Sequence, residues 1–251
     1  MISFVGAGPG AEDLITLRGK NRLESADIII YAGSLVNPKL LDYAKENTEI
    51  FNSANMTLEE VVEVFKRGSS EGKSIVRLHT GDPCIYGAIR EQMDLLDELG
   101  LEYESVAGVS SFIGAAAALN AELTLPEVSQ TVILTRMAGR TPVPEKEEIE
   151  KLASHNATMV IFLTSTMLEE LSERLIAGGY APDTKAAIVY KASWPDEKVF
   201  RTTVANIATV AKENGINKMA LIMVGGFLDD KYARSKLYDP SFTHLFREGS
   251  K

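Results

Sequence analysis

The sequence contains a single cysteine, Cys84, and only three histidines, His79, His155 and His244, which lie far apart in the chain. One cysteine excludes an internal disulfide and a zinc site built from cysteines. Scattered histidines do not form the closely spaced ligand patterns of a metal centre. We therefore expect no metal bound by the protein.

Long apolar runs are also missing, since no stretch reaches the ~18 residues that a membrane-spanning helix needs. The first residues, MISFVGAGPG, carry neither the basic region nor the cleavable apolar region of a secretory signal peptide. We expect a cytoplasmic protein with no membrane partner.

Positive charge is scarce, because 26 Lys and Arg residues stand against 35 Asp and Glu residues and give a net charge of −9. A nucleic-acid-binding protein usually presents a basic face, so we expect no nucleic-acid partner. An acidic small molecule would need positive charge gathered locally around its site.

The length of 251 residues and the 45% hydrophobic content fit one large domain or two small ones. In the first half, apolar runs that alternate with helical patterns predict a mostly parallel five-stranded sheet covered by helices. Four of these strands have an assigned position, at 2–8, 27–31, 74–81 and 102–108. We place helices at 16–26, 86–99 and 109–120, a further helix that begins at Asn37-Pro38, and another that Thr57 and Glu60 open as a capping box.

The segment 119–130 breaks this alternation, so we expect one α/β domain over 1–120 and a second over 121–251. In the second half, strands are predicted at 131–136, 158–164, 185–193, 198–204 and 219–226, with helices near 146–154, 167–177 and 204–213. The turn at Trp194-Pro195 leaves no room for a helix between two of these strands. It therefore predicts a hairpin and a mixed second sheet.

The loop GAGPGA (6–11) matches the dinucleotide-binding pattern G-x-G-x-x-G/A directly after the first strand. Ribose binding would also need an acid at the end of the second strand, where the sequence has Ala32 and Gly33 instead. Pro9 removes a backbone N–H that a pyrophosphate could use. A lone glycine pattern is weak evidence, so an NAD-binding oxidoreductase and a purely structural turn both stay open.

The stretch RLHTGDPCIYG (77–87) is more informative, since it follows a buried strand at the sheet edge where α/β proteins bind ligands. Gly81 would allow a ligand to approach the backbone, and Asp82 would either face that ligand or cap the next helix. We interpret Cys84 as a small buried residue and His79 as a packed, hydrogen-bonded residue.

Five ordered motifs, at 5–19, 27–36, 81–87, 108–112 and 219–225, resemble those of the tetrapyrrole methylases, which use S-adenosyl-L-methionine. The resemblance covers nearly the whole chain. It implies two α/β domains with the active site in a cleft between them, a homodimer, and a tetrapyrrole substrate.

Within this family, YAGSLV (31–36) and RLHTGDPCIYG resemble the branch that methylates C-11 of precorrin-4 or cobalt-precorrin-4 in cobalamin biosynthesis. The uroporphyrinogen-methylating branch typically has an aspartate at the position of Ala32 and an arginine at that of Ala88. Methylation of uroporphyrinogen III or precorrin-2, and tetrapyrrole binding without catalysis, remain alternatives. Whether the substrate carries cobalt stays open.

The resemblance also implies roles for individual residues. Pro9 would line the mouth of the site, and Gly81, Asp82 and Ile85 would hold the methionine end of the cofactor. The remaining cofactor contacts would come from Ser110, Ser111, Leu163, Ala192, Ala220 and Leu221.

A polyanionic tetrapyrrole needs a local basic patch, because the whole chain is acidic. The candidates for carboxylate binding are Arg136 and Arg140 in the loop 135–144, together with Lys191 and Arg90. Glu91 is the candidate for proton handling, and we assign Glu91 and Arg90 to catalysis. For each charged residue a solvated surface position is the structural alternative.

Overall fold

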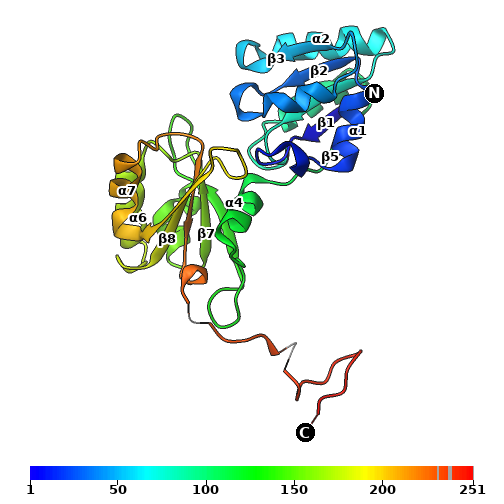
Figure 1. Ribbon diagram of the computed structural model, residues 1–251. Coiled ribbons are helices and arrows are strands. Elements are labelled where there is room, and N and C mark those ends of the chain that lie inside the picture. Colours follow the sequence, from blue (N-terminus) through cyan, green and yellow to red (C-terminus); the bar gives the residue numbers. More distant parts are fainter. Residues whose placement is uncertain (231, 237–238, 251) are drawn as a thin grey trace. The chain divides into compact units, whose positions relative to one another are not determined.

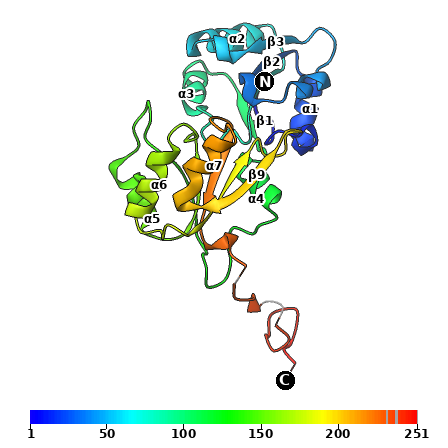
Figure 2. The same cartoon turned by 60° about the vertical axis from the view of Figure 1, so that its left-hand side comes forward.

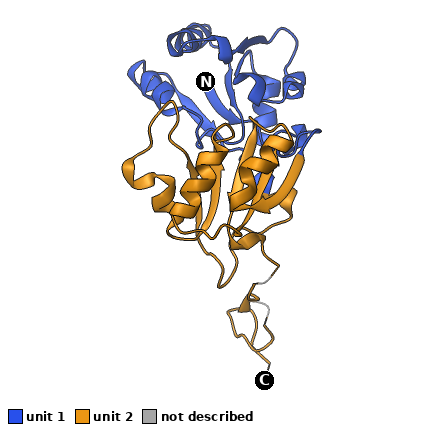
Figure 3. Ribbon diagram, turned by 90° about the vertical axis from the view of Figure 1, so that its left-hand side faces the viewer, with its two compact units in different colours: residues 1–115, 191–197 blue, residues 116–190, 198–251 orange. Residues whose placement is uncertain are grey.

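The computed structural model describes residues 1–230, 232–236 and 239–250 (Figure 1). The chain divides into two compact units (Figure 3): unit 1 comprises residues 1–115 and 191–197, and unit 2 comprises 116–190 and 198–251. The sequence suggested a single boundary at residue 120, and the expected cleft between the domains stays a prediction.

Unit 1 contains a five-stranded sheet in the order β3-β2-β4-β1-β5, in which every neighbouring pair is parallel. Its strands are β1 (Ile2–Gly6), β2 (Ile28–Tyr31), β3 (Glu49–Asn52), β4 (Ile75–His79) and β5 (Tyr103–Val106). The helices of the first half are α1 (Leu17–Ser25), α2 (Leu58–Ser70), α3 (Arg90–Glu98) and α4 (Ser111–Leu119). The parallel α/β class predicted for this half is confirmed.

The two faces of this sheet are covered by different helices, because successive residues of a strand point to opposite sides. On one face, Leu23 of α1 joins Val5, Ile29 and Leu78 in one apolar cluster. On the other face, α2 and α3 pack on the strands in a second apolar cluster. Its buried members are Val61, Val62, Phe65, Leu96, Ile2, Phe4, Ile28, Ile30 and Ile75.

The cap predicted for α2 is present: the Thr57 side chain accepts from the N–H of Glu60, and the Glu60 carboxylate accepts from the N–H of Thr57 at 2.7 Å. Asn37 and Pro38 also begin a helix as predicted, but a 3-10 helix, Pro38–Tyr43. β3 was not among the expected strands.

The helix predicted at 86–99 begins only at Arg90, which corrects its N-terminal boundary. Tyr86 and Ala88 have φ angles of 56° and 49°, in the left-handed region that an α-helix excludes. A Cβ on Gly87 would lie 2.1 Å from the carbonyl oxygen of Pro83. The segment between β4 and α3 is therefore a closely packed loop, and it follows β4 at the carboxyl edge of the sheet.

Unit 2 contains the predicted mixed sheet, whose five strands lie in the order β6-β7-β10-β8-β9. Only β6 and β7 are parallel, and β8 and β9 form the predicted hairpin. Its strands are β6 (Val132–Arg136), β7 (Thr158–Phe162), β8 (Lys185–Tyr190), β9 (Lys198–Thr203) and β10 (Ala220–Val224). The helices α5 (Ile149–Ala153), α6 (Leu168–Ala177) and α7 (Ile207–Glu213) share one apolar cluster with the sheet (Figure 2).

Short 3-10 helices lie at Glu12–Leu14, Gly33–Leu35, Pro38–Tyr43, Ser53–Asn55, Glu145–Glu147, Val204–Asn206 and Gly226–Leu228. In the part of the chain that the structure describes, no helix combines the length and apolar character that crossing a membrane requires. Within those same ranges, no group of three or more His, Cys, Asp and Glu side chains is placed to hold a metal ion.

Candidate functional site

Three glycines bring together the loops that follow β1, β4 and β5. A Cβ on Gly6 would lie 2.5 Å from the Cα of Gly108, and a Cβ on Gly108 would lie 2.2 Å from the carbonyl oxygen of Gly81. No side chain fits between backbones this close. The three strand ends therefore form one rigid floor built mainly from main chain.

Hydrogen bonds hold this floor together. Gly8 and Gly81 form a reciprocal backbone pair, with N–H to oxygen distances of 3.2 and 2.8 Å. The Asp82 carboxylate accepts from the N–H of Cys84 and from that of Gly108, each at 2.8 Å. Asp82 thus joins the turn after β4 to the loop after β5 and does not cap α3. Its two oxygens retain lone pairs for a further donor.

Cys84 lies in this turn and is exposed, which corrects the expectation that it is buried. Its surroundings raise the pKa of the thiol, through partial burial first and then through the hydrogen bond and charge of Asp82. Because the thiolate is the reactive form of cysteine, this environment disfavours a nucleophilic role.

The GAGPGA loop does not have the geometry of a dinucleotide site. The N–H of Gly8 is bonded to Gly81, the N–H of Ala11 donates to the Ser193 hydroxyl at 2.9 Å, and Pro9 has none. The Trp194 ring also covers Gly10, where a Cβ would lie 2.1 Å from the indole. These three positions offer no N–H group to a pyrophosphate, which disfavours the dinucleotide interpretation.

The turn 191–197, which belongs to unit 1, packs on this loop. The indole N–H of Trp194 donates to the carbonyl of Pro9 at 3.1 Å. Pro9 lies so close to α4 that a Cβ on Gly114 would be 2.8 Å from it and 3.6 Å from Ala192. The predicted residues Pro9 and Ala192 are thus brought together, and both are buried.

The predicted residues Ser110 and Ser111 join the same group, at the beginning of α4. Ser110 is buried, and a Cβ on Gly81 would lie 3.3 Å from the nitrogen of Ser111. The first N–H groups of a helix have no partner within the helix and carry partial positive charge. This end of unit 1 therefore combines a carboxylate, a helix N-terminus and closely packed loop backbone.

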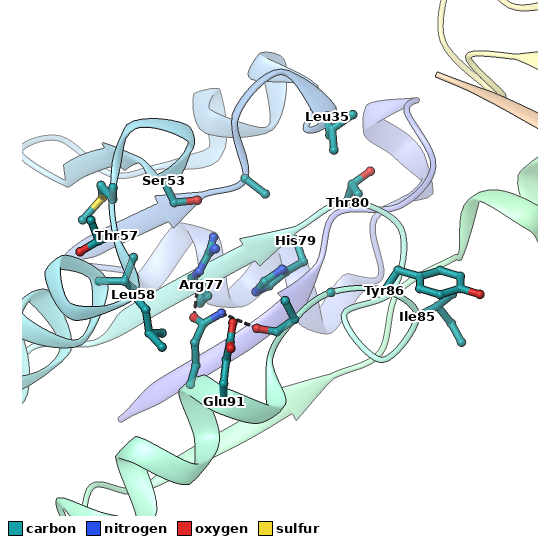
Figure 4. Close-up of a pocket in the computed structure, with 16 residues that line it drawn as sticks. Leu35, Ser53, Thr57, Leu58, Arg77, His79, Thr80, Ile85, Tyr86 and Glu91 are labelled. Atoms are coloured by element: carbon teal, nitrogen blue, oxygen red, sulfur yellow. Dashed lines mark hydrogen bonds between the residues drawn. The ribbon is translucent and has the colours of Figure 1, made fainter. Parts of the chain in front are cut away.

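A cavity of about 270 Å³ lies next to these loops in unit 1 (Figure 4). Its apolar walls include Leu35, Met56, Leu58, Val61 and Ile85. Glu91, from the first turn of α3, also lines it. Arg90 does not: its side chain is 86% exposed and pairs with Asp94 at 2.7 Å.

Two buried polar side chains of β4, Arg77 and His79, reach this cavity. Burial lowers the pKa of Arg77 to about 10. Burial, and to a lesser degree the charge of Arg77, lowers the pKa of His79 to about 3, so its ring is neutral at physiological pH. His79 is packed as expected, but its Nε2 atom is buried without a hydrogen-bond partner.

Arg77 was not among the site residues predicted from the sequence. A signal was nevertheless available, because the residue stands inside an apolar strand, IVRLH, where a charged side chain needs an explanation.

In unit 2, Arg136, Leu163 and Ala220 lie at one edge of the sheet. Arg136 pairs with Phe162 in the register of β6 and β7, Leu163 directly follows β7, and Ala220 begins the neighbouring antiparallel strand β10. Leu163 has a φ angle of 52° and is 66% exposed, so it is not a core residue. Leu221, also predicted, is buried.

The predicted basic residues are mostly occupied with local contacts. Arg136 donates to the carbonyls of Met137, Thr141 and Pro142 at 2.8 to 3.2 Å. Lys191 pairs with Asp196 at 2.6 Å. Arg140 is exposed, and among the described residues it forms no ion pair.

Comparison with known proteins gives consistent matches over the whole chain. The model of the family described as Tetrapyrrole (Corrin/Porphyrin) Methylases matches residues 1–208. A Methanocaldococcus jannaschii protein named cobalt-precorrin-4 C(11)-methyltransferase is 56% identical over 100% of this chain and 97% of its own length. A Pseudomonas aeruginosa protein named precorrin-4 C(11)-methyltransferase is 42% identical over 99% of both chains. A solved structure of a cobalt precorrin-4 methyltransferase of cobalamin biosynthesis superimposes with a TM-score of 0.89, at 48% identity, over 91% of this chain and 95% of the other.

Proposed function

The chain belongs to the tetrapyrrole (corrin/porphyrin) methylase family, and from this premise we propose that it methylates C-11 of cobalt-precorrin-4 with S-adenosyl-L-methionine as the donor. The observation that carries the proposal is the 56% identity, over the whole chain, to a relative named for this reaction. The cobalt form is favoured over the metal-free one because the relative named for precorrin-4 is only 42% identical.

The loops of unit 1 fit the methionine end of this donor. We propose that the Asp82 carboxylate, which retains acceptor capacity, pairs with the donor's ammonium group. The N-terminus of α4 at Ser110 and Ser111 suits its carboxylate. Gly81 gives access to the backbone, with Pro9 and Ile85 beside it.

The adenosine contacts are proposed on the resemblance to the family. Ala192 lies buried beside Pro9 in unit 1. Leu163, Ala220 and Leu221 lie at the carboxyl end of β7 and the start of β10 in unit 2. Apolar side chains with nearby strand backbone suit the binding of a purine.

The bound donor supplies a methyl group on a sulfonium, whose leaving group is a neutral thioether. The protein therefore needs no nucleophile of its own and acts mainly by aligning the two reactants, an effect worth up to ~7–11 kcal/mol. The rigid floor of Gly6, Gly81 and Gly108 suits such alignment, because packed backbone cannot shift easily.

We propose that Glu91 handles the proton after methyl transfer, since it lines the cavity. Arg90 stays a predicted catalytic residue, although its ion pair with Asp94 keeps its charge on the surface of α3. The proposed carboxylate-binding patch contains Arg140, Arg136 and Lys191, of which only Arg140 has no ion pair or hydrogen bond to another described residue.

A homodimer and a cytoplasmic location are also proposed, and both rest on the resemblance to the family. Light scattering coupled to gel filtration would give twice the 27.3 kDa chain mass for the dimer. The chain mass alone would contradict it.

The proposed function is tested by incubating the protein with S-adenosyl-L-methionine and cobalt-precorrin-4, precorrin-4 or uroporphyrinogen III. We expect the mass of one added methyl group with cobalt-precorrin-4 and calorimetric binding of S-adenosyl homocysteine but not of NADH. Preferential methylation of uroporphyrinogen III would contradict the proposal and assign the protein to the uroporphyrinogen-methylating branch of the family. Tetrapyrrole binding without any turnover would identify a carrier.

A further inference from the structure

Arg77 and His79 are unusual residues for the face of the sheet on which they lie. They alternate along β4 with Leu78, so both point to the same side as Ile75. That side carries the apolar cluster of α2 and α3. Arg77 is 7% exposed and His79 is 4% exposed. A charged and a polar side chain thus occupy two positions of an otherwise apolar core.

The protein satisfies only part of the hydrogen-bonding capacity of the Arg77 guanidinium. Its Nε–H donates to the Gln92 side chain at 3.2 Å, and Nη1 donates to the carbonyl of Ile30 at 3.3 Å. Both acceptors are neutral, whereas the guanidinium has five N–H donors and a full charge. Arg77 forms no ion pair with a carboxylate of the described residues, and burial lowers its pKa. A buried charge without a counter-ion is costly.

His79 is held in place without its hydrogen-bonding capacity being used up. Its ring stacks on Phe4, with centroids 6.2 Å apart and an interplanar angle of 29°. The Nε2 atom has no partner, although it is buried. A polar atom left unsatisfied in this way costs stability unless something else binds it.

Both side chains reach the cavity in unit 1, and Figure 4 shows them projecting from β4 into the space beside Thr80 and Leu58. Glu91, the acidic residue on the same cavity, is exposed and lies on the side of α3. The cavity of about 270 Å³ has room for a short aliphatic arm between its apolar walls. Its polar lining includes the Arg77 guanidinium and the His79 imidazole.

We propose that Arg77 and His79 form an anion subsite that binds one carboxylate arm, acetate or propionate, of the tetrapyrrole substrate. The inference rests on the proposed function and adds a specificity-determining site to it. The arm's carboxylate supplies the missing counter-ion for Arg77 and accepts from Nε2–H of His79, while its methylene groups contact the apolar walls. The site is thus built at a cost to stability that substrate binding offsets.

The test compares Arg77→Met, which keeps an unbranched apolar stem but removes the charged guanidinium, with the wild type and with Arg18→Met. Arg18 is an exposed arginine of α1 in the same unit and serves as the matched control. Four quantities are measured for each protein: KM and kcat with cobalt-precorrin-4, the Kd of S-adenosyl homocysteine, and Tm. His79→Phe is measured in the same way as a second variant.

For Arg77→Met we expect KM to rise at least ~10-fold, as for loss of a buried charge-assisted hydrogen bond. We expect an unchanged Kd for S-adenosyl homocysteine and a Tm equal to or above that of the wild type. Arg18→Met should behave as the wild type. An unchanged KM would overturn the subsite. So would a fall in Tm together with weaker S-adenosyl homocysteine binding, because Arg77 would then be a structural residue.

The same variants separate failure of the subsite from failure of the proposed function. If the wild type binds S-adenosyl homocysteine but does not turn over cobalt-precorrin-4, the proposed substrate is wrong. The subsite is then judged by the binding of uroporphyrin III, which carries both acetate and propionate arms. Weaker binding to Arg77→Met than to the wild type supports the subsite. Equal binding, or no binding to the wild type, overturns it.

Discussion

At the scale of single residues, the site depends on a few polar groups that the fold holds in unusual surroundings. Asp82 has a structural role that the hydrogen bonds show and a binding role that we propose. It bonds to two backbone N–H groups from separate loops, at Cys84 and Gly108, and retains lone pairs for a ligand. A change at this residue should therefore affect folding and cofactor affinity together.

Replacing Asp82 with alanine should lower the free energy of unfolding by roughly 2–3 kcal/mol, because two backbone donors lose a charged acceptor. It should also weaken the binding of S-adenosyl homocysteine. Urea denaturation and calorimetry measure the two effects, with Asp42→Ala, at an exposed carboxylate, as the control. An unchanged affinity would remove Asp82 from the cofactor site.

His79 predicts a specific dependence of stability on pH. Its pKa is lowered to about 3 in the folded protein, first by burial and then by the charge of Arg77, against an ordinary value of 6.5. Between these values the unfolded chain binds a proton that the folded chain does not. The contribution of neutral His79 to the free energy of unfolding is therefore complete above pH 6.5. As the pH falls from 6.5 toward 3, the free energy of unfolding decreases by up to ~1.4 kcal/mol per pH unit.

In His79→Phe the dependence of the unfolding free energy on pH should become shallower between pH 6 and pH 4, where denaturant titrations are compared. Arg77 and Glu91 line the same cavity and are retained in this variant. His155→Gln, at an exposed histidine, should keep the wild-type slope. Equal slopes for His79→Phe and the wild type would show that His79 is not buried in its neutral form.

At the scale of elements, the close approach of three strand ends determines the geometry of the site. The loops after β1, β4 and β5 meet through Gly6, Gly81 and Gly108, and the turn 191–197 covers the first of them through Trp194. This contact is made by backbone, so it does not tolerate even a methyl group.

Gly108→Ala should lower the free energy of unfolding by about 3 kcal/mol or more, because the new Cβ would lie 2.2 Å from the carbonyl oxygen of Gly81. Gly100→Ala provides the control, since nothing lies within 4 Å of its Cβ and only its positive φ is unfavourable. Gly100→Ala should lower the free energy of unfolding by about 1 kcal/mol. Equal destabilisation of the two variants in denaturant titrations would contradict the rigid floor.

The elements themselves differ in how far the sequence predicts them. Apolar runs such as Ile28–Tyr31 are found directly, because a buried parallel strand needs them. β3 was not located, since Glu49–Asn52 is a half-exposed edge strand with little apolar pattern. The start of α3 was misplaced because the left-handed φ angles of Tyr86 and Ala88 depend on packing that no local pattern encodes.

The sequence points to those candidate site residues that stand together in one short motif. The motif around Gly81 and Asp82 could be read at the end of a strand. The sequence could not show that Arg136 and Lys191 already have partners. Arg136 donates to loop carbonyls and Lys191 pairs with a nearby carboxylate, and these groups come together only when the turns fold. The subsite of Arg77 and His79 likewise depends on what the tertiary structure leaves unpaired.

At the scale of the whole molecule, a net charge of −9 opposes the approach of a polyanionic substrate. Binding must then rely on short-range, partly buried positive groups, which salt screens less than surface charges. The cofactor, by contrast, carries both charges and meets no such barrier.

Binding of the cofactor product should stabilise the whole chain. At 100 times its Kd, S-adenosyl homocysteine adds about 2.7 kcal/mol to the free energy of unfolding if it binds only the folded state. We expect a clear increase in Tm with this ligand and none with NADH. An increase with NADH alone would support the oxidoreductase alternative.

The most direct measurement is the position of the transferred methyl group. Cobalt-precorrin-4 is incubated with the protein and with S-adenosyl-L-methionine labelled with carbon-13 in its methyl group, and the product is analysed by NMR. Our account predicts a single labelled methyl group, at C-11. A label at any other carbon, or no labelled product from protein that binds S-adenosyl homocysteine, would contradict it.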